Sequence, residues 1–143
     1  MANQSKMKII GLFSELFNSL KPWPSIIWLQ NSLTLEKSIL LSNYLENGVC
    51  FAVVMGAKRD FFSPTELVYG ADSLYSDGKL IWRGDLIHYV KKYRICPSNF
   101  DILDIPSKKE GISEENVMNI WQELYNFYLT EACEASEAPD SRF

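Results

Sequence analysis

The hydrophobic period changes within residues 74–93, LYSDGKLIWRGDLIHYVKKY, and this change is the strongest constraint on what the chain can fold into. Two short β-type runs flank Asp77-Gly78, a pair that readily accepts the positive φ angle of a two-residue hairpin turn. After Trp82 the apolar residues recur about every 3.6 positions, as they do on one face of a helix. The pattern predicts strands at 72–76 and 79–82, followed by a helix over 84–94.

The remaining segments predict the other elements of one α+β domain. The run VCFAVVMG is rich in β-branched and aromatic residues, so it predicts a strand at 49–55 that is buried on both faces and central in the sheet. Ser32 or Thr34 is placed to cap a helix. We expect a small, mostly antiparallel sheet covered by about four helices in a single domain over 1–130, with a frayed acidic tail over 131–143. The other predicted elements are helices near 8–20, 34–46 and 113–130 and a weak strand near 66–69.

Length and composition fit one domain with an uneven charge. The chain has 143 residues, of which 47% are hydrophobic, and this is enough for one substantial core. Residues 1–109 carry 13 Lys and Arg against 10 Asp and Glu, whereas residues 110–143 carry one Arg against eight acids. An acidic C-terminal quarter repels phosphate backbones and attracts basic partners. A solvated helix face followed by a solubilising tail is the structural alternative.

Cysteine usage and the N-terminal segment predict a cytoplasmic protein. Cys50, Cys96 and Cys133 show no C-x-x-C spacing, and a single His cannot complete a zinc site of the usual type. We therefore expect reduced thiols, no metal and no cofactor. Ser14 and Glu15 interrupt the N-terminal apolar stretch, and no small-x-small cleavage site follows. Because no run approaches the roughly 20 apolar residues of a membrane span, we expect no membrane partner.

No catalytic motif is evident. Asp85 and His88 are three positions apart on the predicted helix, close enough for a carboxylate to orient an imidazole. That side points away from the apolar face, so we interpret His88 as an exposed helix residue. The chain has no G-x-S-x-G elbow and no glycine-rich phosphate-binding loop. Asp101 and Asp104 are explained more simply by alternation in a short strand or turn. We predict that the chain is not an enzyme.

Short basic clusters with aromatic neighbours are candidates for nucleic-acid binding. The clusters are Lys58-Arg59, the KKYR segment at 91–94, and Lys108-Lys109. They are short, and the chain as a whole carries a net charge of −4. Compensation of the helix dipole and solubility explain them, so we expect no nucleic-acid partner.

The chain has four tryptophans, and this residue type is enriched both in cores and at interface hot spots. Trp121 lies on the apolar stripe of the last predicted helix, so we expect it in the core. Trp82 lies at the predicted corner between strand and helix, and we expect it to be partly exposed.

Two stretches resemble a group of small bacterial proteins. The stretches are ENGVCFAVVMGAKRDFFSP and SLYSDGKLIWRGDLIHYVKKYRICPSNF. With h for a hydrophobic residue, the group has a strand of the type hVhAShG, a hairpin of the type hhTDGxWhW, and a helix and corner of the type xxDLxYYVExYxhxLPxxF. In this chain these features map to Val49–Gly56, Leu74–Trp82 and Asp85–Phe100.

The matched part is well under half of the chain, and its motifs are structural: a tight turn, an aromatic corner and an amphipathic helix. The departures are Ser76 where the group often has Thr, His88 where it often has Tyr, Lys91 where it often has Glu, and Cys96 where it often has Leu. The substitution at His88 argues further against a catalytic role for that residue.

Proteins of this group look like the immunity partners found beside bacterial toxins, including those of contact-dependent growth inhibition systems. The resemblance implies that the chain binds and neutralises a cognate toxin domain by surface complementarity. The acidic C-terminal quarter suits a basic, nuclease-type toxin. From charge and loop position, the candidate toxin-binding residues are Asp72, Asp77, Asp85, Glu114 and Glu115.

Two other functions remain open. A small-ligand or regulatory binding module would show a pocket lined by aromatic residues with a few convergent polar groups. A small hydrolase or nuclease would require Asp85, His88 and a third polar group to converge in a cleft.

Overall fold

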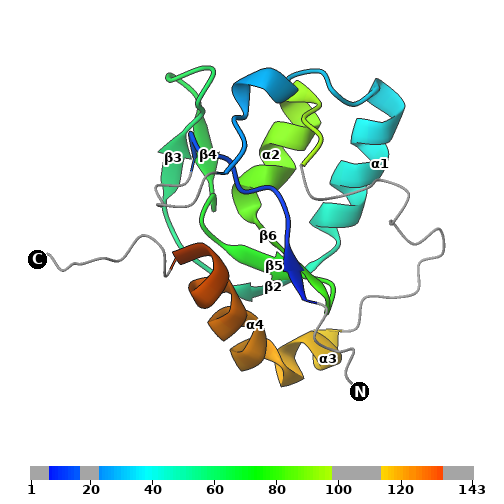
Figure 1. Ribbon diagram of the computed structural model, residues 1–143, viewed down its shortest axis with the longest axis vertical. Helices are drawn as coiled ribbons and strands as arrows, with labels where there is room; N and C mark the ends of the chain where they lie inside the picture. The colour runs from blue at the N-terminus through cyan, green and yellow to red at the C-terminus, as the bar shows by residue number, and fades with distance from the viewer. Residues whose placement is uncertain (1–6, 17–22, 98–113, 134–143) are drawn as a thin grey trace, which may run out of the picture.

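A computed structural model describes residues 7–16, 23–97 and 114–133 of the chain. They form a small α+β domain in which a four-stranded sheet lies between two helical layers (Figure 1). This confirms the predicted fold class. The helices are α1 (Leu35–Glu46), α2 (Gly84–Tyr93), α3 (Glu114–Asn119) and α4 (Trp121–Tyr128), with a 3₁₀ turn η2 (Ile27–Leu29) and a π-helical turn η4 (Leu129–Cys133).

The sheet is mostly antiparallel, as the sequence predicts. Its strand order is β1-β6-β5-β2, and only the pairing of β1 with β6 is parallel. A separate hairpin is formed by β3 and β4, and β4 is the weak strand expected near 66–69. The strands are β1 (Lys8–Ile9), β2 (Val49–Ala52), β3 (Ala57–Arg59), β4 (Leu67–Tyr69), β5 (Leu74–Ser76) and β6 (Leu80–Arg83).

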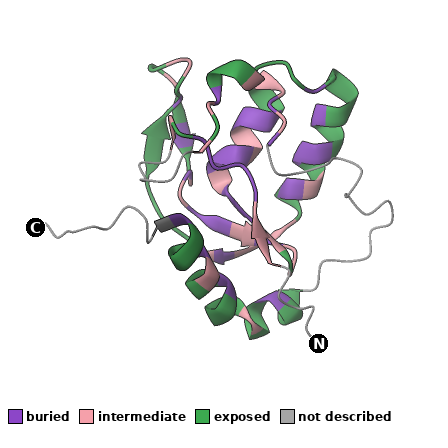
Figure 2. Ribbon diagram, viewed as in Figure 1, coloured by how far each residue is buried: buried purple, intermediate pink, exposed green. Residues whose placement is uncertain are grey.

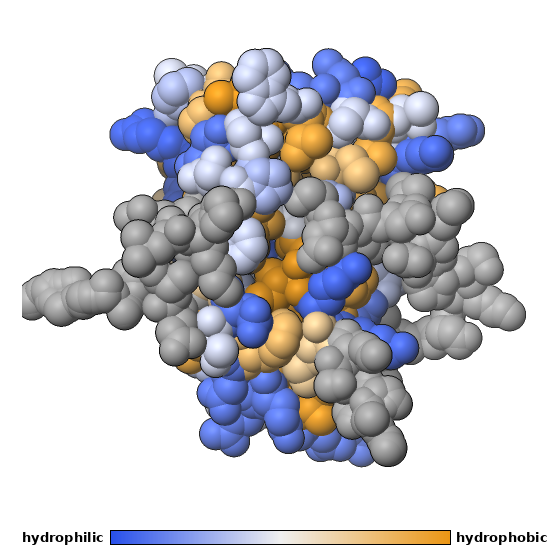
Figure 3. Space-filling model, viewed as in Figure 1, coloured by the Kyte–Doolittle hydropathy of each residue, from blue (hydrophilic) through white to orange (hydrophobic). Residues whose placement is uncertain are grey.

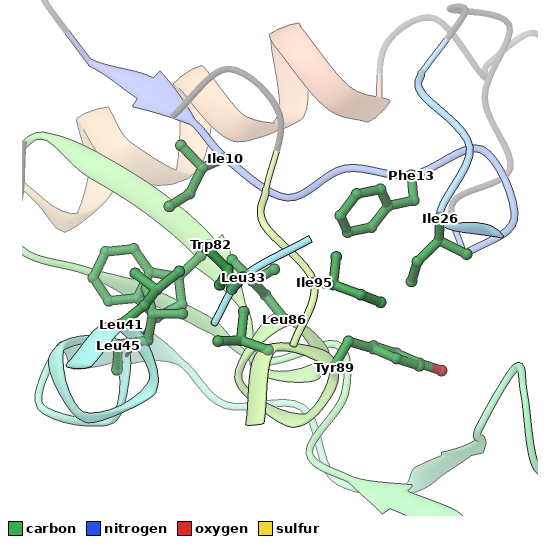
Figure 4. Close-up of a cluster of buried hydrophobic side chains, with 11 residues drawn as sticks. Ile10, Phe13, Ile26, Leu33, Leu41, Leu45, Trp82, Leu86, Tyr89 and Ile95 are labelled. Atoms are coloured by element: carbon green, nitrogen blue, oxygen red, sulfur yellow. Dashed lines mark hydrogen bonds between the residues drawn. The ribbon is translucent and has the colours of Figure 1, made fainter. Parts of the chain in front are cut away.

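Neighbouring residues of β6 reach opposite helical layers, because side chains alternate across a strand. Trp82 packs with the cluster that includes α1 and α2, whereas Ile81 packs with α3 and α4. Figure 4 shows Trp82 beside Leu41 and Leu45 of α1, and its Nε1 donates a hydrogen bond to the Leu45 carbonyl at 3.3 Å. The expectation that Trp82 is partly exposed is therefore wrong, because α1 covers the corner and the ring is fully buried.

The hairpin and α2 form where the change of period predicts them. Gly78 takes a φ of 106° in the turn between β5 and β6. The Asp77 N–H donates to the Leu80 carbonyl at 3.4 Å, so the turn encloses Gly78 and Lys79, one residue later than predicted. Arg94 ends α2 in the left-handed conformation, with a φ of 53°.

α1 also forms where it was predicted, and the structure decides between its two possible caps. Thr34 Oγ1 accepts a hydrogen bond from the Lys37 amide at 3.1 Å, so Thr34 caps the helix. Ser32 Oγ instead accepts a hydrogen bond from the Cys96 amide at 2.8 Å, which ties the segment before α1 to the segment after α2.

The predicted helix over 8–20 is wrong for the described part of that segment. Its first residues form β1, which pairs with β6. Gly11 follows with a φ of 79°, in the left-handed region where a right-handed helix cannot continue. A Cβ atom on Gly11 would lie 2.7 Å from the Leu86 side chain, so glycine also allows this segment to cross α2 closely. Residues 17–22 of the predicted helix lie outside the described residues.

β2 is an edge strand and not the central strand that its apolar run predicts. It is also shorter than the predicted strand over 49–55. Beyond it, Ser73 Oγ accepts a hydrogen bond from the Val54 amide at 2.9 Å and donates one to the Val54 carbonyl at 3.3 Å. A side chain thus satisfies this backbone in place of a neighbouring strand. The exposed apolar residues of this extension are Val53, Val54 and Met55.

The predicted helix over 113–130 is observed as α3 and α4, which are separated at Ile120 and extended by η4. Val117, Leu124 and Tyr128 are buried against the sheet, so these helices form one of the two layers that cover it. Trp121 is 43% exposed, and its assignment to the core is wrong. The apolar stripe of this segment is wider than the area that the sheet covers.

None of the described helices is both long enough and apolar enough to span a membrane. Cys50 is a free thiol. Most of the predicted acidic tail, residues 134–143, lies outside the described residues.

Candidate functional site

The outer side of α3, α4 and η4 carries four exposed apolar side chains. Successive members are three, four and four positions apart, a spacing that places them on one side of a helical segment. Each exposes between 37% and 43% of its surface. Figure 2 shows exposed residues along the outer side of α4 and buried residues on the side toward the sheet. We call this surface, composed of Met118, Trp121, Tyr125 and Leu129, the α4 face.

Trp121 and Tyr125 form the centre of the α4 face. Their ring centroids lie 6.5 Å apart, with an angle of 46° between the ring planes. The opposite side of the same helix is fixed to the sheet, because Leu124 is fully buried and the Tyr128 hydroxyl accepts a hydrogen bond from Arg83 at 3.3 Å. The exposed aromatic pair is therefore held by a packed helix, as the anchor residues of protein interfaces commonly are.

Three carboxylates on the same helices add negative charge to this part of the surface. Glu114, Glu115 and Glu123 are exposed, and none of them has an ion-pair partner among the described residues. Figure 3 shows hydrophilic and hydrophobic residues side by side over α3 and α4, at the lower end of the view. Of the five predicted toxin-binding residues, Glu114 and Glu115 lie here.

Two of the other predicted residues, Asp72 and Asp85, belong to a network centred on Arg83. Arg83 Nη2 donates hydrogen bonds to Asp72 Oδ1 at 2.6 Å and to Asp85 Oδ2 at 3.0 Å. Asp85 is only 4% exposed, so it cannot contact a partner directly. Asp72 is partly exposed and also pairs with Lys58 at 3.2 Å.

The charge state of this network follows from its composition. Burial by itself lowers the pKa of Arg83, but the adjacent Asp85 carboxylate and the hydrogen bonds to Asp85 and Tyr128 outweigh it and raise the pKa. Arg83 therefore stays charged at any pH at which the protein is folded. Its role is to compensate the buried carboxylate and to join β6 to α4.

Asp77, the last of the five predicted residues, stabilises the β5–β6 turn. Its Oδ1 accepts hydrogen bonds from the amides of Lys79 at 2.9 Å and Leu80 at 2.8 Å, and its Oδ2 accepts one from the Tyr44 hydroxyl. Burial of Tyr44 and the carboxylate of Asp77 raise the pKa of that hydroxyl, which stays protonated as the donor. The contacts of Asp77 are thus largely structural.

His88 pairs with Asp60 and not with Asp85. The distance between His88 Nε2 and Asp60 Oδ2 is 2.7 Å, and the Tyr93 hydroxyl lies 3.0 Å from the same oxygen. The Asp60 side chain is fully buried and that of His88 is 20% exposed, so the interpretation of His88 as an exposed residue is wrong. Sequence spacing did not reveal this pair, because Asp60 follows β3 and precedes His88 by 28 positions.

Asp60 connects the β3–β4 hairpin to α2. Its Oδ1 also accepts hydrogen bonds from the amides of Phe62 at 2.7 Å and Ser63 at 3.1 Å. Burial by itself raises the pKa of Asp60, but the hydrogen bonds from His88, Phe62 and Tyr93 outweigh it and lower the pKa below its ordinary value. The carboxylate is therefore ionised and supplied with donors on both oxygens.

The pair of Asp60 and His88 has the form of a carboxylate that orients a general base. Among the described residues, however, no hydroxyl or thiol is hydrogen-bonded to His88 as a nucleophile. The imidazole packs edge-on against Tyr89, with ring centroids 5.0 Å apart. The described contacts give the pair a structural task, which is to hold the hairpin on α2.

Asp60, Glu66 and His88 offer ligand atoms within 4.8 Å of one another, a spacing at which a metal ion can be held. The donors already present do not fit such an ion. Both oxygens of Asp60 accept protein hydrogen bonds, and the Lys92 ammonium pairs with Glu66. A cation would have to displace Lys92 and the protein donors, so we assign no metal to this cluster.

The basic clusters are largely neutralised where the structure describes them. Lys58 pairs with Asp72, Lys91 pairs with Glu46, and Lys92 pairs with Glu66. Arg59 is different, because its guanidinium donates to the Pro64 carbonyl at 3.0 Å. Asp101, Asp104 and Lys108-Lys109 lie outside the described residues.

The α4 face is the surface that sequence reasoning missed. Its spacing was visible in the sequence, but a helical stripe does not indicate which of its members a sheet will cover. Comparison with protein-family models, with curated proteins and with solved structures gives no match.

Proposed function

We propose that this protein is an immunity protein that binds a basic toxin domain through the α4 face and so blocks the toxin. The observation that carries the proposal is the exposed pair Trp121 and Tyr125, with Glu114, Glu115 and Glu123 on the same helices and without ion-pair partners among the described residues. An aromatic centre with unneutralised charge around it is the arrangement expected of a protein-docking surface.

The two components of this surface contribute differently to binding. Tryptophan and tyrosine are enriched among the residues whose truncation costs an interface about 2 kcal/mol or more. Carboxylates at the rim mainly accelerate association with a basic partner, and salt weakens their effect. Trp121 and Tyr125 thus supply affinity, and the glutamates supply steering and a preference for a basic surface.

The location of the α4 face also supports the proposal. The stretches that resemble immunity proteins form β2, β3, the β5–β6 hairpin and α2, which belong to the scaffold. The α4 face lies outside those stretches. A shared scaffold with a separate docking element is a reasonable arrangement for inhibitors that must each recognise a different toxin.

The contacts described above revise the set of toxin-binding candidates. Asp77 and Asp85 serve the scaffold, and Asp72 is a candidate only at the margin of an interface, because it bridges Lys58 and Arg83. Glu114 and Glu115 are retained. Trp121, Tyr125 and Glu123 are added.

The test uses a basic toxin domain that a tagged copy of this protein retains from its native lysate, produced separately and titrated with the purified full chain. Wild type should bind it and suppress its toxicity on co-expression. Trp121→Ala should weaken binding by about 30-fold or more. Trp28→Ala is the matched control, because Trp28 on η2 is 82% exposed and should be replaceable without effect.

The charge component has its own control. The triple variant Glu114→Gln, Glu115→Gln, Glu123→Gln should associate more slowly and with less dependence on salt, whereas Glu36→Gln in α1 should behave like wild type. Unchanged affinity in Trp121→Ala, with the variant folded, would place the interface elsewhere. Absence of both binding and protection in the wild type would contradict the proposed function.

A further inference from the structure

A pocket of about 390 Å³ lies beside the β3–β4 hairpin and is separate in its residues from the α4 face. Its volume is within the range of small-ligand sites. One part of the lining is apolar and consists of Leu16, Phe61, Val68 and Ala71. Val68 and Ala71 are buried, so this wall belongs to the folded scaffold.

The buried hydroxyl of Tyr89 gives the pocket a hydrogen-bond donor. Tyr89 is 1% exposed, and its oxygen accepts a hydrogen bond from the Phe61 amide at 2.9 Å. No acceptor for the proton of this hydroxyl is found among the described residues. In Figure 4 the hydroxyl oxygen lies at the far end of the ring from the other labelled side chains. Burial raises the pKa of Tyr89 to about 12, so the proton is present at neutral pH.

Four charged residues line the pocket, and two of them are neutralised within the protein. Lys58 pairs with Asp72, and Asp85 pairs with Arg83. Lys58 and Asp85 are therefore neutralised without a charged group from a ligand.

The other two, Glu15 and Arg59, have no oppositely charged partner among the described residues. Glu15 accepts hydrogen bonds from the Ser25 hydroxyl and from the Ile26 amide at 2.7 Å, which are neutral groups. Burial by itself raises the pKa of Glu15, but these hydrogen bonds lower it below the ordinary value, so the carboxylate is ionised. Among the described residues, the Arg59 guanidinium donates only to the neutral Pro64 carbonyl. The pocket thus offers one negative charge, one positive charge, one hydroxyl donor and an apolar wall.

We propose that this pocket binds a free α-amino acid with an apolar side chain. The ligand carboxylate pairs with the Arg59 guanidinium and accepts a hydrogen bond from the Tyr89 hydroxyl. The ligand ammonium pairs with the Glu15 carboxylate. The apolar side chain of the ligand packs on Phe61 and Val68. A zwitterion matches the two opposite charges, whereas a simple anion or a simple cation leaves one of them unpaired.

The first experiment varies the ligand and leaves the protein intact. L-Leucine should bind the full chain with a Kd of about 1 mM or tighter in calorimetric titration. L-Leucinamide lacks the carboxylate and 4-methylpentanoic acid lacks the ammonium, so each should bind at least about tenfold more weakly. Equal binding of the three compounds, or no saturable binding of L-leucine or L-phenylalanine at about 20 mM, would overturn the proposal.

The second experiment assigns the charges to residues. Arg59→Gln should lose the preference for L-leucine over L-leucinamide, and Glu15→Gln should lose the preference for L-leucine over 4-methylpentanoic acid. Lys79→Gln in the β5–β6 turn is the control for removal of an exposed cation and should keep both preferences. Trp121→Ala should bind L-leucine like wild type, because the pocket and the α4 face share no residue. Preferences that survive in Arg59→Gln and Glu15→Gln would contradict the proposed orientation.

Discussion

The Asp60 carboxylate and the His88 imidazole lie 2.7 Å apart, although 28 positions separate them in the sequence. Asp60 follows β3 and His88 lies in the middle of α2, so the contact joins the β3–β4 hairpin to the helical layer. Tyr93 and the amides of Phe62 and Ser63 donate to the same carboxylate. A fully buried acid with donors on both oxygens is a structural centre of this end of the molecule.

Asp60→Ala should therefore destabilise the protein more than His88→Ala does. Loss of the carboxylate leaves several buried donors without an acceptor, and we expect a decrease in the free energy of unfolding of about 3 kcal/mol. His88→Ala removes one donor from a partly exposed site and should cost about 1 kcal/mol. Urea denaturation followed by tryptophan fluorescence measures both. His88→Ala should still bind the toxin, and a folded His88→Ala protein without protective activity would mean that this residue has a direct role.

The same carboxylate predicts a pH dependence of stability. Because the pKa of Asp60 is lower in the folded protein than its ordinary value of 3.8, ionised Asp60 stabilises the fold above that value. This contribution is lost as the pH falls through the lower, folded pKa. Asp60→Asn imitates the protonated form, so the difference in unfolding free energy between wild type and Asp60→Asn should shrink from neutral pH toward pH ~2.5. A difference that stays constant over this range would mean that the folded pKa of Asp60 is not lowered.

Arg83 should be far more important for stability than the exposed lysines. Arg83→Met leaves the buried Asp85 without its cation and should cost about 3–5 kcal/mol. Asp85→Asn, added to Arg83→Met, removes the uncompensated charge and should recover part of that loss. Lys91→Met breaks an exposed pair with Glu46 and should cost less than about 1 kcal/mol. The comparison requires thermal or urea unfolding of the wild type, the two single variants and the double variant. Equal losses of unfolding free energy in Arg83→Met and Lys91→Met would show that the Arg83 network does not stabilise the fold.

Truncation of two tryptophans should affect different properties: the stability of the fold at Trp82 and the binding of a partner at Trp121. Trp82→Ala empties a fully buried site between β6 and α1 and should cost about 3–5 kcal/mol of stability. Trp121→Ala removes a ring that is 43% exposed and should cost about 1 kcal/mol or less, while it weakens toxin binding. Thermal unfolding of the free protein separates the two effects. A large loss of stability in Trp121→Ala would assign this ring to the core and would remove the anchor of the α4 face.

The sequence by itself determined the local elements whose signals lie close together. The turn at Gly78, the cap at Thr34 and the apolar periods of α1 and α2 depend on neighbours within a few positions, and each formed within about one residue of its prediction. The α+β class follows from such elements, because an apolar helix face must pack on the apolar face of a sheet. The acidity of the chain's last quarter was also visible directly in the sequence.

Tertiary structure decided what each apolar or charged residue faces. Met55 is 86% exposed because the edge strand β2 ends before it, and Trp82 is fully buried because α1 covers its corner. The hydrophobic period of a segment shows which of its residues share a face. Burial of that face depends on which other elements pack on it. For the same reason Asp85 was predicted at the surface but lies beside Arg83 in the interior, and Trp121 was predicted in the core but lies on the α4 face. Contacts between residues distant in sequence, which local patterns do not encode, determine the candidate docking surface.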